Sequence, residues 1–197
     1  HRLNRRQRQM CIRDSIYPSL TIFASILPLY FVATSSEYRL SRIETWLSRK
    51  CDLGIDLLGD CFQLNQSRIA ISSGGLFGLG PGTSRARWGS LPNSYSDFIS
   101  SIIGEEYGFF GLFLLVLAFF ILISTTFLIA IREKNEIKKL ISVGFGSWIF
   151  FQTVINLGGA VGIVPITGIV LPFVSYGSSA MISIFIALGI MYSRDYE

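Results

Sequence analysis

The chain has 197 residues, of which 50% are hydrophobic and 15% are charged. Soluble domains carry about 25% charged residues, so this composition favours a membrane protein and argues against intrinsic disorder. The net charge is +4, but the basic residues lie beside apolar stretches and form no groove-shaped patch, so we expect no nucleic-acid partner. Because His1 is the sole histidine, Ser-His-Asp catalysis, Cys-His catalysis and histidine-based zinc sites are excluded.

The chain opens with a basic segment, residues 1–14 (HRLNRRQRQMCIRD), which we interpret as non-native sequence or a disordered tail. Four apolar stretches follow, each long enough for the roughly 20 residues that a membrane-spanning helix needs. They cover residues 15–34, 107–131, 140–161 and 168–192. We therefore predict that residues 15–197 form an all-α polytopic membrane protein with four transmembrane helices and a long loop, residues 35–106. Pro172 and the Ser/Gly cluster at 175–179 predict a broken or closely packed last helix.

The basic residues predict the orientation of these helices. They gather before the first span and between the second and third, as Arg2, Arg5, Arg6, Arg8, Arg13, Arg132, Lys134, Lys138 and Lys139. Because Lys-rich and Arg-rich loops stay in the cytoplasm, both segments and the C-terminus are predicted to be cytoplasmic, and residues 35–106 extracytoplasmic. In an oxidising compartment Cys51 and Cys61 could form a disulfide; two isolated thiols are the alternative.

Two segments of the long loop have informative patterns. Residues 37–50 (EYRLSRIETWLSRK) place apolar side chains on one helical face, which predicts an amphipathic helix on the membrane surface; a solvated linker helix is the alternative. Residues 63–82 (QLNQSRIAISSGGLFGLGPG) are rich in glycine but match neither a P-loop nor a dinucleotide-binding fingerprint. Their glycines allow the backbone to come close to a helix or a ligand.

Asp97 stands at the start of the helix that is predicted to lead into the second span, and it has two interpretations. Ser94-Tyr-Ser-Asp97 fits a capping box, so Asp97 either caps this helix or faces a substrate cavity at the membrane surface. Glu105 follows on roughly the same helical face.

In the third span Gln152 and Asn156 either form interhelical hydrogen bonds or line a polar cavity. No cluster has the spacing of metal ligands, so no metal site is predicted.

Three motifs then occur in order: QLNQSRIAISSGGLFGLGPG, LPNSYSDFISSIIGEEYG and FQTVINLGGAVGIVPITGIVLPFVSYGSS. Together they resemble the SEDS family of bacterial shape, elongation, division and sporulation proteins, over about residues 15–193. The second motif is most similar to the division members, and the elongation members are the alternative. Members of the family have ten membrane helices. The resemblance therefore implies a C-terminal fragment that holds the last four helices and the large outer loop.

The resemblance also implies a function. SEDS proteins polymerise lipid II into peptidoglycan glycan strands at the outer face of the bacterial cytoplasmic membrane, with a class B penicillin-binding protein as transpeptidase. The family's essential aspartate falls on Asp97, which implies a general base for the acceptor hydroxyl. Membrane lipids are expected as further partners. The residues expected to bind the substrate are Arg68, Arg85, Arg87, Glu105, Ser175 and Tyr176. Those expected to line the cavity are Gln152 and Asn156.

Several alternatives stay open. Tyr95 stands where the family commonly has histidine, so no imidazole is expected to share the proton transfer. No cofactor is assigned, although a divalent cation held by the substrate and an acidic side chain is compatible with the chemistry. Polar groups inside the spans leave a transporter or flippase for lipid-linked precursors as an alternative function, and a non-catalytic scaffold as another. We expect the fragment alone to be inactive.

Overall fold

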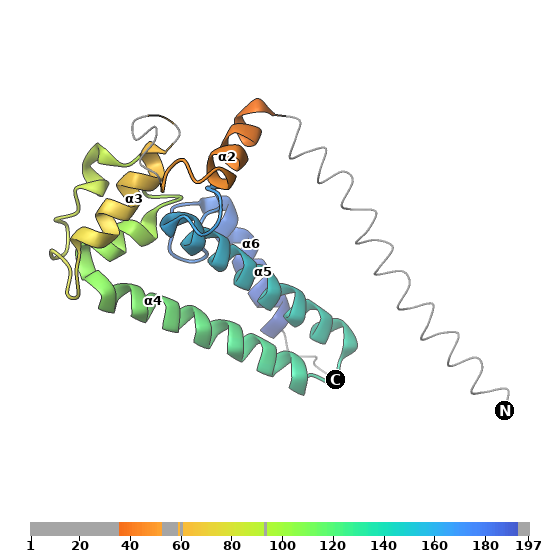
Figure 1. Cartoon of the computed structure of the whole chain (residues 1–197). Coiled ribbons are helices and arrows are strands. Elements are labelled where there is room, and N and C mark those ends of the chain that lie inside the picture. The colour runs from red at the N-terminus through yellow and green to blue at the C-terminus, as the bar shows by residue number, and fades with distance from the viewer. Residues whose placement is uncertain (1–35, 53–58, 60, 93, 193–197) are drawn as a thin grey trace. The chain divides into compact units, whose positions relative to one another are not determined.

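A computed structural model describes residues 36–52, 59, 61–92 and 94–192, and this part of the chain is helical and contains no strand. Its elements are α2 (Glu37–Leu47), α3 (Phe62–Ser73), η1 (Ala86–Ser90), α4 (Ile99–Arg132), α5 (Glu136–Val161) and α6 (Ser178–Tyr192) (Figure 1). The predicted all-α class is thereby confirmed for these ranges. The tail at 1–14 and the first predicted span at 15–34 lie outside the described residues.

The chain divides into two compact units, residues 1–47 and residues 48–197. The described part of the first unit is α2, which lies within the predicted amphipathic segment 37–50. Leu40, Ile43, Trp46 and Leu47 are exposed there, as the periodicity predicts. The helix is confirmed, and its place on a membrane surface stays a prediction.

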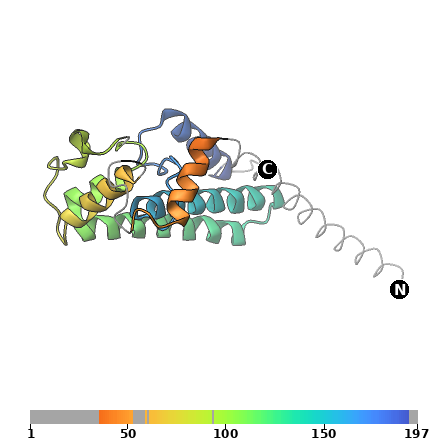
Figure 2. The same ribbon diagram turned by 45° about the horizontal axis from the view of Figure 1, so that its top comes forward.

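In the second unit, α4 and α5 are the two described helices long and apolar enough to cross a membrane. They contain the spans predicted at 107–131 and 140–161. A three-residue loop joins them, and they run side by side in opposite directions (Figures 1 and 2). Asn135 begins α5 as its N-cap, because its side-chain oxygen accepts hydrogen bonds from the amides of Ile137 and Lys138.

Gly108 interrupts α4 near its first quarter, with φ +65° and ψ −156°. The segment after α3, residues 74–80, fills this break. The amides of Phe109 and Phe110 donate to the carbonyls of Gly75 and Leu76, while the carbonyls of Glu105 and Glu106 accept from the amides of Leu79 and Gly80. A Cβ at Gly78 would collide with the Glu106 backbone. The glycine-rich segment therefore allows a close approach to a helix and satisfies the backbone groups that the break frees.

The fourth predicted span differs from the structure, because residues 168–177 are not helical and α6 begins only at Ser178. Gly168 and Phe173 both have positive φ, +72° and +62°, which a helix cannot accommodate. At 15 residues α6 is about 22 Å long, shorter than the roughly 30 Å hydrocarbon core of a membrane. The broken C-terminal segment that Pro172 and the Ser/Gly cluster predict is present, but the break comes before α6.

Two apolar clusters hold the second unit together. One joins α3, η1, the start of α4 and the end of α5, and includes Phe98 and Ile102. The other joins α4, α5 and α6, and includes Phe145, Ile149 and Ile184. The loop between α5 and α6 contributes Leu171 to the second cluster. This packing places the turn before α4 against the end of α5 and the loop that follows it.

Candidate functional site

Asp97 lies in the turn immediately before α4. The residue that caps this helix is the buried Phe98, and no side chain makes a capping hydrogen bond there. Within the described ranges, the Asp97 carboxylate accepts no hydrogen bond, although its backbone carbonyl does. The capping interpretation is therefore not what the structure shows. The carboxylate is half-buried and available to another group.

A small pocket lies beside Asp97. Its walls come from the turn before α4, the end of α5 and the loop after α5: Asp97, Phe98, Ile155, Asn156, Gly159, Ala160, Ile166, Thr167, Gly168 and Ile169. Its internal volume is about 10 Å³, room for roughly one water molecule. Gly168 forms a wall beside the carboxylate, since a Cβ there would lie 3.5 Å from Asp97 Oδ2. The predicted pair Asp97 and Asn156 thus meets in one pocket.

Three consecutive backbone carbonyls around Asp97 are each held by a different group. The amide of Tyr176 donates to the Tyr95 carbonyl at 3.1 Å. The hydroxyl of Ser175 donates to the Ser96 carbonyl at 2.5 Å. The side-chain amide of Asn156 donates to the Asp97 carbonyl at 3.0 Å. Three predicted site residues therefore converge on the segment that carries Asp97, through its backbone.

The other predicted cavity residue, Gln152, lies one turn before Asn156 on α5. Its Nε2 donates to the Val170 carbonyl at 2.9 Å, and it is not part of the pocket wall. Asn156 likewise donates to the Ile169 carbonyl at 2.7 Å. Both amides are almost fully buried. Gln152 and Asn156 thus both anchor the loop between α5 and α6, and of these two only Asn156 also lines the pocket.

Glu105, predicted to bind substrate, is buried with 2% of its surface exposed. Its carboxylate accepts from the Ser84 hydroxyl at 2.6 Å and from the amides of Arg85 and Ala86, each at 3.1 Å. With these three hydrogen bonds the buried carboxylate holds the turn at residues 84–87 against α4. The exposed side chains of Arg85 and Arg87 project from this turn, and the Arg87 guanidinium lies 5.7 Å from the centre of the Trp88 ring.

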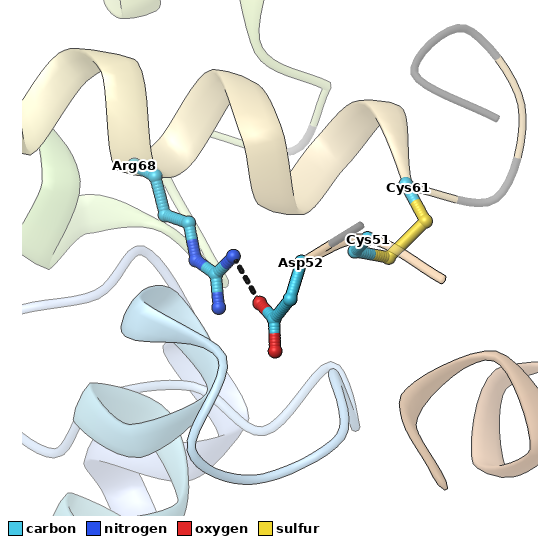
Figure 3. Close-up of a disulfide and its surroundings, with 4 residues drawn as sticks. All are labelled: Cys51, Asp52, Cys61 and Arg68. Carbon is cyan, nitrogen blue, oxygen red and sulfur yellow. Dashed lines mark hydrogen bonds and ion pairs between the residues drawn. A yellow bond between two sulfur atoms is a disulfide. The ribbon is translucent and has the colours of Figure 1, made fainter. Parts of the chain in front are cut away.

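Arg68, also predicted to bind substrate, is already paired. Its Nη1 lies 2.7 Å from Asp52 Oδ1 (Figure 3). Its Nε donates to the Val161 carbonyl at the end of α5. Asp52 follows Cys51, which forms a disulfide with Cys61. The disulfide alternative is therefore the one that the structure shows. It holds Asp52 beside α3, and Arg68 then links α3 to the end of α5.

Of the remaining predicted residues, Ser175 is buried and Tyr176 is exposed at 86% of its surface. Sequence reasoning missed Ser84, whose hydroxyl completes the Glu105 site, and Ser67, whose hydroxyl joins Ser101 at 2.7 Å and the Ala160 carbonyl at 2.6 Å. Isolated serines carry no local signal for such contacts. In the described ranges no group of three His, Cys, Asp or Glu side chains could hold a metal ion.

Comparison with known proteins gives consistent matches. The family described as "Cell cycle protein", comprising FtsW, RodA and SpoVE, matches residues 12–197. The probable peptidoglycan glycosyltransferase FtsW of Wigglesworthia glossinidia brevipalpis is 37% identical over 175 residues, 87% of this chain and 45% of that protein. Stage V sporulation protein E of Bacillus subtilis is 40% identical over 165 residues, 81% of this chain and 44% of that protein.

A solved structure is also similar, from work on the structural coordination of polymerization and crosslinking by a peptidoglycan synthase complex. It superposes with a TM-score of 0.59 at 26% identity, over 89% of this chain and 46% of that one. The chain spans about half the length of the relatives it matches. On the match to almost all of its length, the chain belongs to the FtsW/RodA/SpoVE family of cell cycle proteins.

Proposed function

We propose that this chain is the C-terminal part of an FtsW-type peptidoglycan glycosyltransferase that polymerises lipid II, with Asp97 as general base. The family match and the relatives named FtsW support the reaction. One observation supports the role of Asp97: its carboxylate lies at a pocket and accepts no hydrogen bond within the described ranges. The backbone carbonyls of residues 95–97 are meanwhile each held by a hydrogen bond. A general base needs this combination of a fixed position and a free lone pair.

The chemistry fits such a group. The acceptor sugar hydroxyl attacks the anomeric carbon of the donor, the bond from that carbon to the lipid pyrophosphate breaks, and the hydroxyl proton passes to Asp97. The pyrophosphate leaves as an anion and is stabilised by positive charge. Arg85 and Arg87, which project from the turn that Glu105 holds, are the candidates for that charge. A divalent cation carried by the pyrophosphate would serve the same end.

The reaction is proposed to occur at the outer face of the bacterial cytoplasmic membrane. The Cys51–Cys61 disulfide supports an extracytoplasmic place for the segment around it, because such bonds persist in oxidising compartments. A class B penicillin-binding protein is the proposed partner, since the similar solved structure couples polymerization to crosslinking. Division is proposed over elongation because several of the similar relatives are named FtsW.

The transport alternative has less support than the enzyme. It rests on the polar residues of α5, yet the amides of Gln152 and Asn156 donate to loop carbonyls at 2.9 Å and 2.7 Å. Groups committed to fixed loop contacts serve to hold the fold and are poor lining for a path that a substrate travels.

The test compares wild type with Asp97→Asn in a full-length protein, with the preceding helices and the transpeptidase partner supplied. Asp97→Asn is expected to lower lipid II polymerisation by about 10²-fold or more, because the amide cannot take the proton. Glu136→Gln, an exposed acid on α5, is the matched charge control and should keep wild-type activity. Wild-type glycan product from Asp97→Asn would overturn the proposed role.

A further inference from the structure

The carboxylate of Asp97 has no hydrogen bond of its own in the described structure, and α4 begins only two residues later. Its position therefore depends on what holds the backbone of residues 95–97. We propose that Ser175 and Asn156 are positioning residues that set where this carboxylate lies, and that neither needs to contact the substrate. The proposal rests on the proposed function of Asp97 as general base.

The Ser175 hydroxyl both accepts and donates a hydrogen bond. The oxygen accepts from the Leu171 amide at 2.8 Å, and the hydrogen is donated to the Ser96 carbonyl at 2.5 Å. The residue is 7% exposed. The hydroxyl thus ties the turn at residues 171–175 to the segment just before Asp97, and no donor remains for a substrate.

Asn156 makes an equivalent link from α5. The two hydrogens of its Nδ2 are donated to the carbonyls of Asp97 and Ile169. Asp97 and Ile169 both form walls of the pocket, so one amide fixes the distance between two of its sides. The residue is 5% exposed, which keeps water from competing for these bonds.

The loop that presents Ser175 is strained in a way that fits this role. Phe173 has φ +62°, a conformation that side chains with a Cβ seldom adopt. The turn persists because the Leu171 carbonyl accepts from the amides of Val174 and Ser175, and the Leu171 amide donates to the Ser175 hydroxyl. Backbone strain maintained by such contacts is characteristic of segments that hold functional groups in place.

A shift of about 1 Å in a catalytic group can reduce turnover by about 10²-fold, so loss of either anchor should reduce kcat. We expect Ser175→Ala to lower kcat for lipid II polymerisation at least tenfold while KM changes by less than threefold. Ser175→Thr keeps a hydroxyl and should restore most of kcat. Ser183→Ala is the matched control, because the Ser183 hydroxyl bonds only within α6 and is exposed. It should match wild type.

Asn156→Asp provides the second arm, because the carboxylate keeps the side-chain shape and removes both donors. It should show the same fall in kcat with little change in KM. All variants are measured in the full-length protein with its partner, after thermal unfolding and complex formation show that they are folded. Direct substrate binding by Ser175 would instead raise KM, and this result would overturn the proposal.

The design separates the two proposals. Asp97→Asn is assayed alongside the other variants. If Asp97→Asn is inactive while folded Ser175→Ala and Asn156→Asp keep wild-type kcat, the positioning roles are wrong and the general base stands. If Asp97→Asn polymerises like wild type, the proposed role of Asp97 as general base is wrong, and the positioning roles are wrong with it.

Discussion

At the scale of single residues, two carboxylates eight positions apart in the chain have opposite environments. Glu105 is buried and accepts three hydrogen bonds from residues 84–86, whereas Asp97 accepts none within the described ranges and faces a pocket. A buried carboxylate that accepts three hydrogen bonds stabilises structure, and one that accepts none has its lone pairs free to take a proton. These surroundings give Glu105 a structural role and agree with the chemical role proposed for Asp97.

The structural role of Glu105 predicts a loss of stability in Glu105→Gln. Oε2 accepts from both Ser84 and Ala86, and Oε1 accepts from Arg85. An amide nitrogen in either position would face a backbone N–H, so one buried donor would lose its acceptor. We expect the free energy of unfolding to fall by about 1–3 kcal/mol. The measurement is the thermal midpoint of unfolding in detergent.

The exposed Glu136 provides the control for this substitution. Glu136→Gln removes an equal charge at the first turn of α5 and should lower the free energy of unfolding by less than about 1 kcal/mol. If Glu105→Gln unfolds at the same temperature as Glu136→Gln, the buried carboxylate does not stabilise the turn at 84–87.

Of the residues that the sequence predicted for the site, Asp97 and Asn156 line one pocket, whereas the hydrogen bonds of Glu105 to residues 84–86 were not foreseen. The physical reason is the origin of its donors. Ser84, Arg85 and Ala86 precede Glu105 by 19 to 21 residues and belong to a turn with no repeating pattern. Helical periodicity places Glu105 on a face of α4, but it cannot show which segment packs on that face.

At the scale of elements, the break in α4 and the glycine-rich segment form one unit. Four backbone hydrogen bonds join residues 75–80 to residues 105–110, and these are the groups that an unbroken helix would pair internally. Gly78 and Gly108 lie where the two segments approach closely, because a Cβ at either position would collide with backbone of the other segment. Glycine at these two positions is therefore needed for helix–loop packing, which explains both residues without a ligand.

This packing predicts different outcomes for two glycines with almost equal backbone angles. Gly78 has φ +81° and faces the Glu106 backbone, whereas Gly82 has φ +78° with open space around it. Gly82→Ala should lower the free energy of unfolding by about 1–2 kcal/mol, from left-handed strain alone. Gly78→Ala adds a collision with backbone that cannot move cheaply, so it should unfold at a clearly lower temperature. Equal thermal midpoints for the two variants would contradict the close approach.

Hydropathy located α4 and α5 well, because length and composition are enough to define an apolar helix. It did not locate the break at Gly108 or the start of α6 at Ser178. Both depend on partners elsewhere in the chain: residues 74–80 satisfy the first, and Ser96 and Asn156 hold the loop before the second. An apolar window contains no information about such contacts.

At the scale of the whole molecule, the contacts around the pocket connect three parts of the chain. Arg68 links the disulfide-held Asp52 to the end of α5, and Ser67 joins the same end of α5 to Ser101 of α4. α5 in turn carries Asn156, which holds Asp97. The disulfide, the pocket and the helix break therefore lie toward one end of the α4–α5 hairpin, and the loop at Lys134 lies at the other.

This arrangement makes the orientation in the membrane testable, with the pocket end predicted outside and Lys134 in the cytoplasm. The background protein carries Cys11→Ser and keeps Cys51 and Cys61, so it should resist a membrane-impermeant maleimide on intact cells until a reductant opens the disulfide. Pro81→Cys, exposed near the helix break, should be labelled on intact cells. Lys134→Cys should be labelled only after the cells are permeabilised. If Lys134→Cys but not Pro81→Cys is labelled on intact cells, the predicted orientation is wrong. Asp97 would then lie on the cytoplasmic side, away from an outward-facing lipid-linked substrate.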